Sequence, residues 1–162
     1  MAVDMFIKIG DIKGESIDAS HKEEISVLAW SWGLSQSGST HISTGSGAGK
    51  VNVQDLSLTK WVDTASTALM GAACKGTHIK EAKLTVRKAG DKPLEYIKIT
   101  LNDVIVSSVQ TGGSGGEDRL TENVVLNFGK FKVEYTSQNK DGSSGKTSEV
   151  VWDIPANAAK GG

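Results

Sequence analysis

Apolar and polar residues alternate with a period of two along most of this chain, a pattern typical of half-buried β-strands. The alternation is clearest at residues 5–9, 25–36, 52–60, 81–88, 94–110, 122–138 and 147–154. The segment 94–110 is long enough for two strands, and we expect a break near Asn102 and Asp103. The pattern therefore predicts about nine short strands in a mainly β fold, either a barrel or a sandwich.

The segment 122–138 is predicted to form two strands or one long bent strand. Its apolar residues change parity across Gly129, and a bulge at this glycine would direct both sets into the core. The sets are Val124, Leu126 and Phe128 before the glycine, and Phe131, Val133 and Tyr135 after it.

One segment, 63–76, has a helical period. Asp63 is a good N-cap, Gly76 suits the C′ position, and the other side chains are mostly small. The apolar stripe comprises Ala65, Leu69, Ala72 and Ala73. We therefore expect one helix, about 63–75, packed outside the strands, in a single domain over residues 1–155 with a flexible tail at 156–162.

Composition narrows the functional classes. The chain has 162 residues and a net charge of -1, which gives no field for binding nucleic acid or an anionic membrane. No apolar run approaches the roughly 20 residues that span a bilayer, so membrane insertion is not expected. The first residues lack the features of a signal peptide and Cys74 is the only cysteine, so we predict a cytoplasmic location.

Candidate chemistry is sparse. The glycine-rich segment around Gly45 and Gly49 has the wrong spacing for a phosphate-binding P-loop, and Lys50 is followed by valine. Cys74 and His78 have a spacing that could chelate a metal, but Gly76 interrupts the helix between them and there is no second pair. We therefore predict no catalytic residue, no metal and no cofactor, and no enzymatic activity.

The segment 25–36 carries two tryptophans that flank one serine. Simple alternation assigns a bulky face that must be covered and a face that tapers to small, polar residues. The covered set is Ser26, Leu28, Trp30, Trp32 and Leu34, and the opposite set is Ile25, Val27, Ala29, Ser31, Gly33 and Ser35. The small face suits either solvent or a surface that another molecule approaches closely, and periodicity alone leaves both interpretations open.

Several segments, in this order and spacing, resemble the Hcp (haemolysin-coregulated protein) family, the tube protein of bacterial type VI secretion. They include DMFIKIGDIKGES (4–16), EISVLAWSWG (24–33), YIKITLNDVIVSSV (96–109) and LTENVVLNFGKFKVEY (120–135). The resemblance implies a compact β-barrel with one helix, assembled as hexameric rings that stack into a tube. It also implies a contractile sheath, a spike protein at the tip and small effector proteins in the lumen as partners, and a chain that is cytoplasmic before firing and is then secreted without a signal peptide.

Two sets of site residues follow from this resemblance. The small face of the tryptophan strand is the candidate lumen surface, with Ala29, Ser31, Gly33 and Ser35. The long loop 37–50 is the candidate contact with a neighbouring subunit or ring, through Ser43, Thr44, Gly45, Ser46, Gly47, Ala48, Gly49 and Lys50. The alternative is a monomeric ligand-binding β-barrel with a dry apolar pocket.

Overall fold

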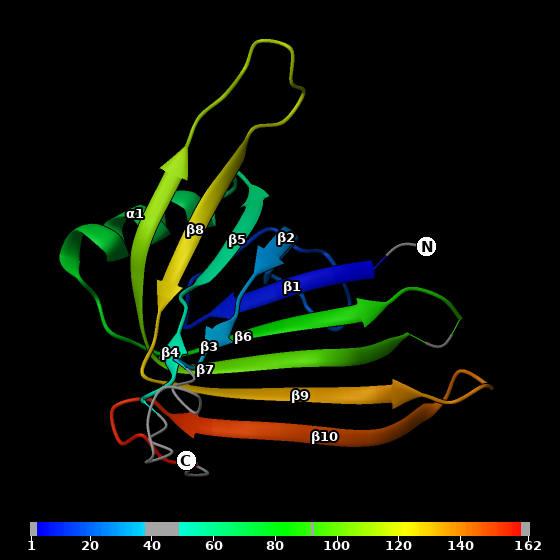
Figure 1. Ribbon diagram of the computed structural model, residues 1–162. Coiled ribbons are helices and arrows are strands. Elements are labelled where there is room, and N and C mark those ends of the chain that lie inside the picture. The colour runs from blue at the N-terminus through cyan, green and yellow to red at the C-terminus, as the bar shows by residue number, and fades with distance from the viewer. Residues whose placement is uncertain (1–2, 38–48, 92, 160–162) are drawn as a thin grey trace.

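The computed structural model describes residues 3–37, 49–91 and 93–159 (Figure 1). In this part of the chain it has ten strands and one helix, so the predicted mainly β fold with one helix is confirmed. The elements are β1 (Val3–Ile9), β2 (Ile25–Ser31), β3 (Leu34–Ser35), β4 (Asn52–Val53), β5 (Leu56–Trp61), α1 (Ala65–Lys75), β6 (Ile79–Lys88), β7 (Leu94–Thr111), β8 (Thr121–Asn127), β9 (Lys130–Gln138) and β10 (Ser144–Asp153).

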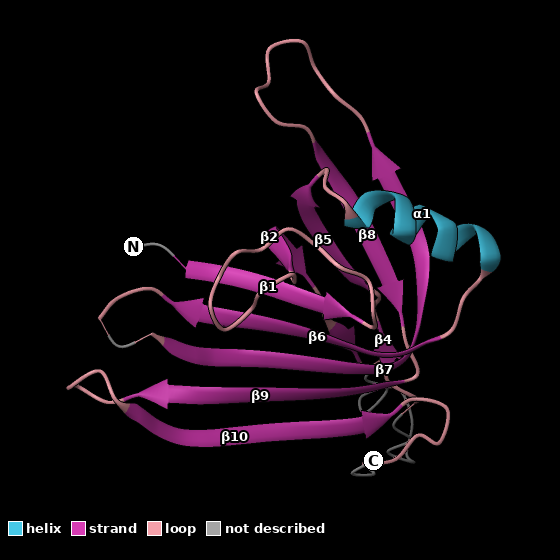
Figure 2. Ribbon diagram, turned by 180° about the vertical axis from the view of Figure 1, so that it is seen from behind, coloured by secondary structure: helices cyan, strands magenta, loops and turns pink. Residues whose placement is uncertain are grey.

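Six of these strands close the barrel. They follow the order β7-β6-β1-β2-β5-β8, and β8 pairs again with β7. The strands β9 and β10 continue the sheet beyond β7, and Figures 1 and 2 show them as an extension to one side of the barrel. We call this part, β9 with β10, the sheet extension. The barrel is therefore confirmed, but it uses fewer strands than the sequence pattern suggested.

The long strand β7 belongs to both parts of the fold. Its first half pairs with β9, from Ile97 opposite Tyr135 to Asn102 opposite Lys130. Its second half pairs with β8, beginning with Ile105 opposite Asn127. The strands β8 and β9 thus follow one another along the same edge of β7, so the segment 122–138 forms two strands. The expected break of 94–110 into two strands near Asn102 and Asp103 is wrong, because β7 runs without interruption from Leu94 to Thr111 and only bends there.

The bend occurs where two irregular positions face each other. Asp103 of β7 has a φ of 55°, and the Gly129 N–H donates a hydrogen bond to the Asn102 carbonyl at 3.0 Å. The predicted change of parity is confirmed at the bend, since Phe128 and Phe131 are both buried. Tyr135 was expected in the core, but it is exposed because it lies on the sheet extension, beyond the barrel.

Side chains fill the barrel interior. The largest apolar ones that are almost completely inaccessible come from all six barrel strands, as expected for a barrel of this size. They include Ile7, Ile9, Ile25, Leu56, Leu58, Leu84, Leu101, Val104 and Leu126. The interior is therefore a packed core.

The helix α1 begins at Ala65, two residues later than the predicted start. Asp63 still caps it, because its Oδ1 accepts a hydrogen bond from the Ala65 N–H at 2.9 Å. Gly76 ends the helix with a φ of 60° and donates its N–H to carbonyls of the last turn. Leu69 is fully buried in the common core, and the helix packs against β7 (Figure 2).

The loop between β1 and β2 is fixed over the outer side of β1 by ionic contacts. Arg87 of β6 binds Asp18 of this loop at 2.5 Å and Asp4 of β1 at 3.1 Å. The hydrogen bond from the Arg87 guanidinium lowers the pKa of Asp18 to about 2. His21 of the loop stacks on Phe6 with ring centroids 4.5 Å apart. This side of the barrel is therefore covered.

The bend in β7 gives a stability prediction. Asp103→Val should lower the free energy of unfolding by about 1–2 kcal/mol, because a β-branched residue is strained at positive φ. Asp103→Gly should stay within about 0.5 kcal/mol of the parent, since glycine adopts this backbone freely. Urea unfolding at equal protein concentration measures both, and equal losses for valine and glycine would contradict the explanation.

Candidate functional site: an uncharged face of the barrel wall

The tryptophan segment is interrupted after Ser31 and contains a β-bulge within its first strand. The structure has two strands, β2 and β3, where the sequence predicted one continuous strand over 25–36. The register between β2 and β5 shifts between Val27 and Ala29. Ile25 and Val27 are consequently buried, whereas Leu28 is 38% exposed. The predicted faces are therefore wrong at these three residues, because a bulge changes which side successive residues occupy.

The two tryptophans pack against the core, as predicted. Trp30 and Trp32 are partly buried, and the Trp32 ring meets Phe131 edge-on with centroids 4.9 Å apart. The Trp32 indole N–H donates to the Gln54 carbonyl at 2.8 Å, which fixes the ring beside β4. Leu34 was assigned to the same covered face, but it is 51% exposed because it lies in the separate strand β3.

The residues that alternate with the tryptophans lie mostly at the surface. Ala29, Ser31 and Ser35 are exposed, and Gly33 is half-buried beside the Gln54 side chain. They are the four residues that the sequence singled out as a small face. Of the predicted contact loop, Gly49 and Lys50 are exposed, and Ser43 to Ala48 lie outside the described residues.

The small face continues over three neighbouring strands. Ser31 lies opposite Ser57 of β5, and Ser57 lies opposite Val125 of β8. The next row runs from Ala29 through Thr59, Asn123 and Gln110. The Thr59 hydroxyl donates to Asn123 Oδ1 at 2.7 Å, which ties adjacent strands together on the outside. We call this outer surface of β2, β5, β8 and residues 104–111 of β7 the polar face.

The polar face carries no formal charge at its strand positions. In these four strand segments the charged residues are Lys60 and Glu122, and both side chains are completely buried. The Lys60 ammonium lies 2.5 Å from Glu122 Oε1 and 2.9 Å from Asp63 Oδ1. Ser66 of α1 also donates its hydroxyl to Glu122. The charges are thus directed away from the outer surface and neutralise each other inside.

This inward ion pair is not among the features predicted from the sequence, although a signal for it is present. Lys60 shares the parity of Leu56 and Leu58, and Glu122 shares that of Val124 and Leu126. An opposite charge on each of two strands, both in the inward phase, is the pattern that a buried pair requires.

The described residues offer little for catalysis or metal binding. They contain no group of three metal-ligating side chains, and Cys74 and His78 are both exposed. In the same part of the chain, no helix has the length and apolar character needed to cross a membrane.

The comparisons with known proteins agree with one another. The sequence model of the family described as "Type VI secretion system effector, Hcp" matches residues 6–135. The protein hcp1 of Pseudomonas aeruginosa is 61% identical over 159 residues, which are 97% of this chain and 98% of that protein. This chain belongs to the Hcp family.

Solved structures extend the similarity to the whole fold. Hcp1 from Salmonella typhimurium is 40% identical, with a TM-score of 0.80, over 97% of this chain and 98% of that one. A structure described as a type six secretion system protein is 32% identical, with a TM-score of 0.91, over 98% of this chain and 100% of that one. The chain is thus a type VI secretion protein of a structural, secreted family with a β-barrel fold.

The buried ion pair gives the second prediction. Lys60→Met leaves the Glu122 and Asp63 carboxylates buried without their cation, which should cost about 3–5 kcal/mol of unfolding free energy. The double variant Lys60→Met, Glu122→Leu should cost less than Lys60→Met alone, because it removes the uncompensated charge of Glu122 as well. Urea unfolding followed by tryptophan fluorescence measures this, and a double-variant loss equal to the sum of the two single losses would exclude the coupling.

Proposed function

We propose that this chain is the tube subunit of a type VI secretion system, forming hexameric rings that stack and carry small effector proteins in the lumen. The observation that carries this proposal is that one subunit has two unlike open surfaces. One is the uncharged polar face, and the other is an apolar strip on the sheet extension. A closed ring needs unlike patches that meet between neighbours, together with a further surface that lines its bore.

The apolar strip begins inside the barrel and continues out of it. Paired residues of successive strands place Ile99, Val133 and Val150 in one row of the same sheet face. Ile99 is buried, Val133 is half-buried and Val150 is 51% exposed, so the exposed fraction of the apolar side chains increases from β7 to β10. The neighbouring Tyr135 is 48% exposed. A strip of this kind on an edge of the fold is typical of a surface that a partner covers.

The polar face supports the lumen assignment. Small uncharged side chains such as Ala29, Ser31 and Ser57 leave room for a folded cargo protein. They also avoid a strong field of one sign that would select or reject cargo by its net charge. Ala29, Ser31, Gly33 and Ser35 would then line the bore and contact effectors.

Further partners belong to the same proposal. The loop Ser43 to Lys50 would contact a neighbouring subunit or the next ring, because 37–50 is long for a connection between strands. A spike protein would bind at the tip of the tube and a contractile sheath around it. The chain would be cytoplasmic before firing and secreted afterwards without a signal peptide.

A monomeric ligand-binding barrel is the alternative. Such a protein needs an open apolar cavity inside the barrel. Here Leu58, Leu101 and Leu126 fill the interior, each with 1% or less of its surface exposed. The packed interior therefore favours the ring, and the mass of the purified protein separates the two functions.

Assembly is the third prediction. The purified chain should have a mass near six times 17.1 kDa by light scattering. Val150→Glu should shift it to smaller species, because a carboxylate would be buried in the apolar contact between neighbours. Circular dichroism should remain that of the parent, since Val150 is half-exposed in the subunit.

Thr147→Glu is the matched control for Val150→Glu. Thr147 is exposed on the same strand but on the opposite sheet face, so the same charge should leave the ring intact. A parent chain that is a monomer would refute the tube-subunit proposal. Equal disruption by both variants would refute the assignment of the apolar strip.

Cargo binding is the fourth prediction. Ser31→Arg should change the free energy of unfolding by less than about 0.5 kcal/mol and leave the ring intact. It should reduce co-purification of a small effector, because six large cations would then project into the bore. Trp30→Ala is the contrasting variant and should destabilise the subunit by about 2–3 kcal/mol, somewhat less than a fully buried tryptophan. Full cargo binding by Ser31→Arg would exclude this face from the lumen.

A further inference from the structure

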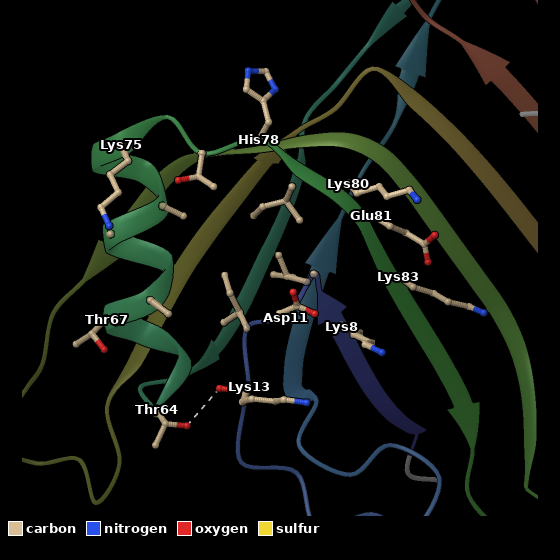
Figure 3. A pocket seen from close by; sticks show the side chains of 18 residues that line it. Lys8, Asp11, Lys13, Thr64, Thr67, Lys75, His78, Lys80, Glu81 and Lys83 are labelled. Carbon is tan, nitrogen blue, oxygen red and sulfur yellow. Dashed lines mark hydrogen bonds between the residues drawn. The ribbon is translucent and has the colours of Figure 1, made fainter.

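A wide groove separates the helix α1 from the ends of β1 and β6 (Figure 3). Its volume is about 1340 Å³, which exceeds the roughly 300–1,000 Å³ typical of small-molecule pockets. At the start of α1 the walls meet, because the Thr64 hydroxyl donates to the Lys13 carbonyl at 3.3 Å and the Thr64 N–H donates to Glu15 at 2.7 Å. The groove continues from there past Lys75 to His78.

The rim of the groove is basic. Five lysines line it against two carboxylates, Asp11 and Glu81, although the whole chain has a net charge of -1. These lysines are Lys8, Lys13, Lys75, Lys80 and Lys83. Lys13 pairs with Glu23 at 3.5 Å, whereas the other four form no ion pair within the described parts of the chain. The lining of the groove therefore carries three more positive than negative side chains.

The helix side of the groove is shaped by small side chains. Ala68 is exposed, and a Cβ added at Gly71 would meet no atom within 4 Å. Ile12 also lines the groove and is partly buried against the core. The combination of an apolar floor and a cationic rim fits a segment that is apolar on one side and acidic on the other. A polyanion without an apolar side, such as a nucleic acid backbone, would leave the floor uncovered.

We propose that this groove binds an acidic amphipathic segment of another protein. Small apolar side chains of that segment would cover Ala68, Gly71 and Ile12. Its carboxylates would pair with Lys8, Lys80 and Lys83 on the strand side and with Lys75 on the helix side. This proposal does not rest on the ring, since the groove is complete within one subunit.

Binding can be measured with a defined probe. We suggest a labelled, end-blocked peptide of alanine, leucine and glutamate whose glutamates share one helical face, followed by fluorescence anisotropy on the intact full-length protein. A peptide of the same composition in scrambled order, and one with lysine in place of glutamate, are the controls. Binding should weaken at least tenfold with each control peptide, and it should also weaken as salt rises.

Variants of the protein locate the site. Gly71→Gln should weaken binding at least tenfold, because the new side chain occupies the groove while glutamine favours the helix more than glycine does. Lys8→Glu combined with Lys80→Glu should have the same effect through charge. Lys140→Glu makes a matched charge change on the distant β9–β10 turn and should leave binding unchanged.

Four results would overturn the proposal. The first two are a scrambled peptide that binds as tightly as the acidic amphipathic peptide, and a Lys140→Glu variant that weakens binding as much as the Lys8→Glu, Lys80→Glu variant does. The other two are a duplex DNA probe that binds more tightly than the acidic peptide, and a changed oligomeric mass in the Lys8→Glu, Lys80→Glu variant. The last result would make the groove an interface between copies of this chain. Loss of peptide binding in variants that keep the parent's mass would support the groove, whatever the outcome for the ring.

Discussion

The structure depends on the bend of β7, the one strand that belongs to both the barrel and the sheet extension. β6 covers one edge of β7, and β9 followed by β8 covers the other. Asp103 and Gly129 face each other at the bend, so the second half of β7 can turn away and carry β8 round to β5. An unbent β7 would leave β8 in line with β9 and the barrel open. The bend of β7 therefore both closes the packed core and sets the apolar strip of the sheet extension apart from it.

The buried charges of β5 and β8 determine the character of the outer wall. Lys60 and Glu122 could each have projected from the polar face, but both point inward and bind each other. A buried ion pair contributes little more to the free energy of unfolding than an apolar pair of the same size would. The contribution of Lys60 and Glu122 is therefore to the position of α1 and to the uncharged outer wall. Asp63 and Ser66 join the same cluster and attach the start of α1 to the barrel. The cluster of Lys60, Glu122, Asp63 and Ser66 therefore has two effects. It keeps both strand charges away from the polar face, and it positions the helix that forms one wall of the groove.

Local sequence signals predicted the positions of most strands, the helix caps and the change of parity at Gly129, because each depends on neighbouring residues. The bulge at Leu28 could not be predicted this way, since the register of β2 against β5 creates it and those strands are distant in sequence. The same holds for the groove, whose lysines come from residues 8 to 83 and meet only through the topology. The pairing of Lys60 with Glu122 is a contact between distant strands, but the inward direction of each side chain follows from its parity within its own strand. Parity alone could therefore have indicated the pair.

The order of the barrel strands connects the two proposed surfaces. In the closed order β7-β6-β1-β2-β5-β8, β6 lies across the barrel from β5 and β1 lies across from β8. The polar face covers β2, β5, β8 and residues 104–111 of β7 and is centred on β5 and β8, whereas the groove borders β1, β6 and α1. A subunit that turns the centre of its polar face to the bore of a ring would therefore direct its groove away from the bore. Cargo in the lumen and an acidic partner around the ring could then bind at the same time, without competing for a single residue.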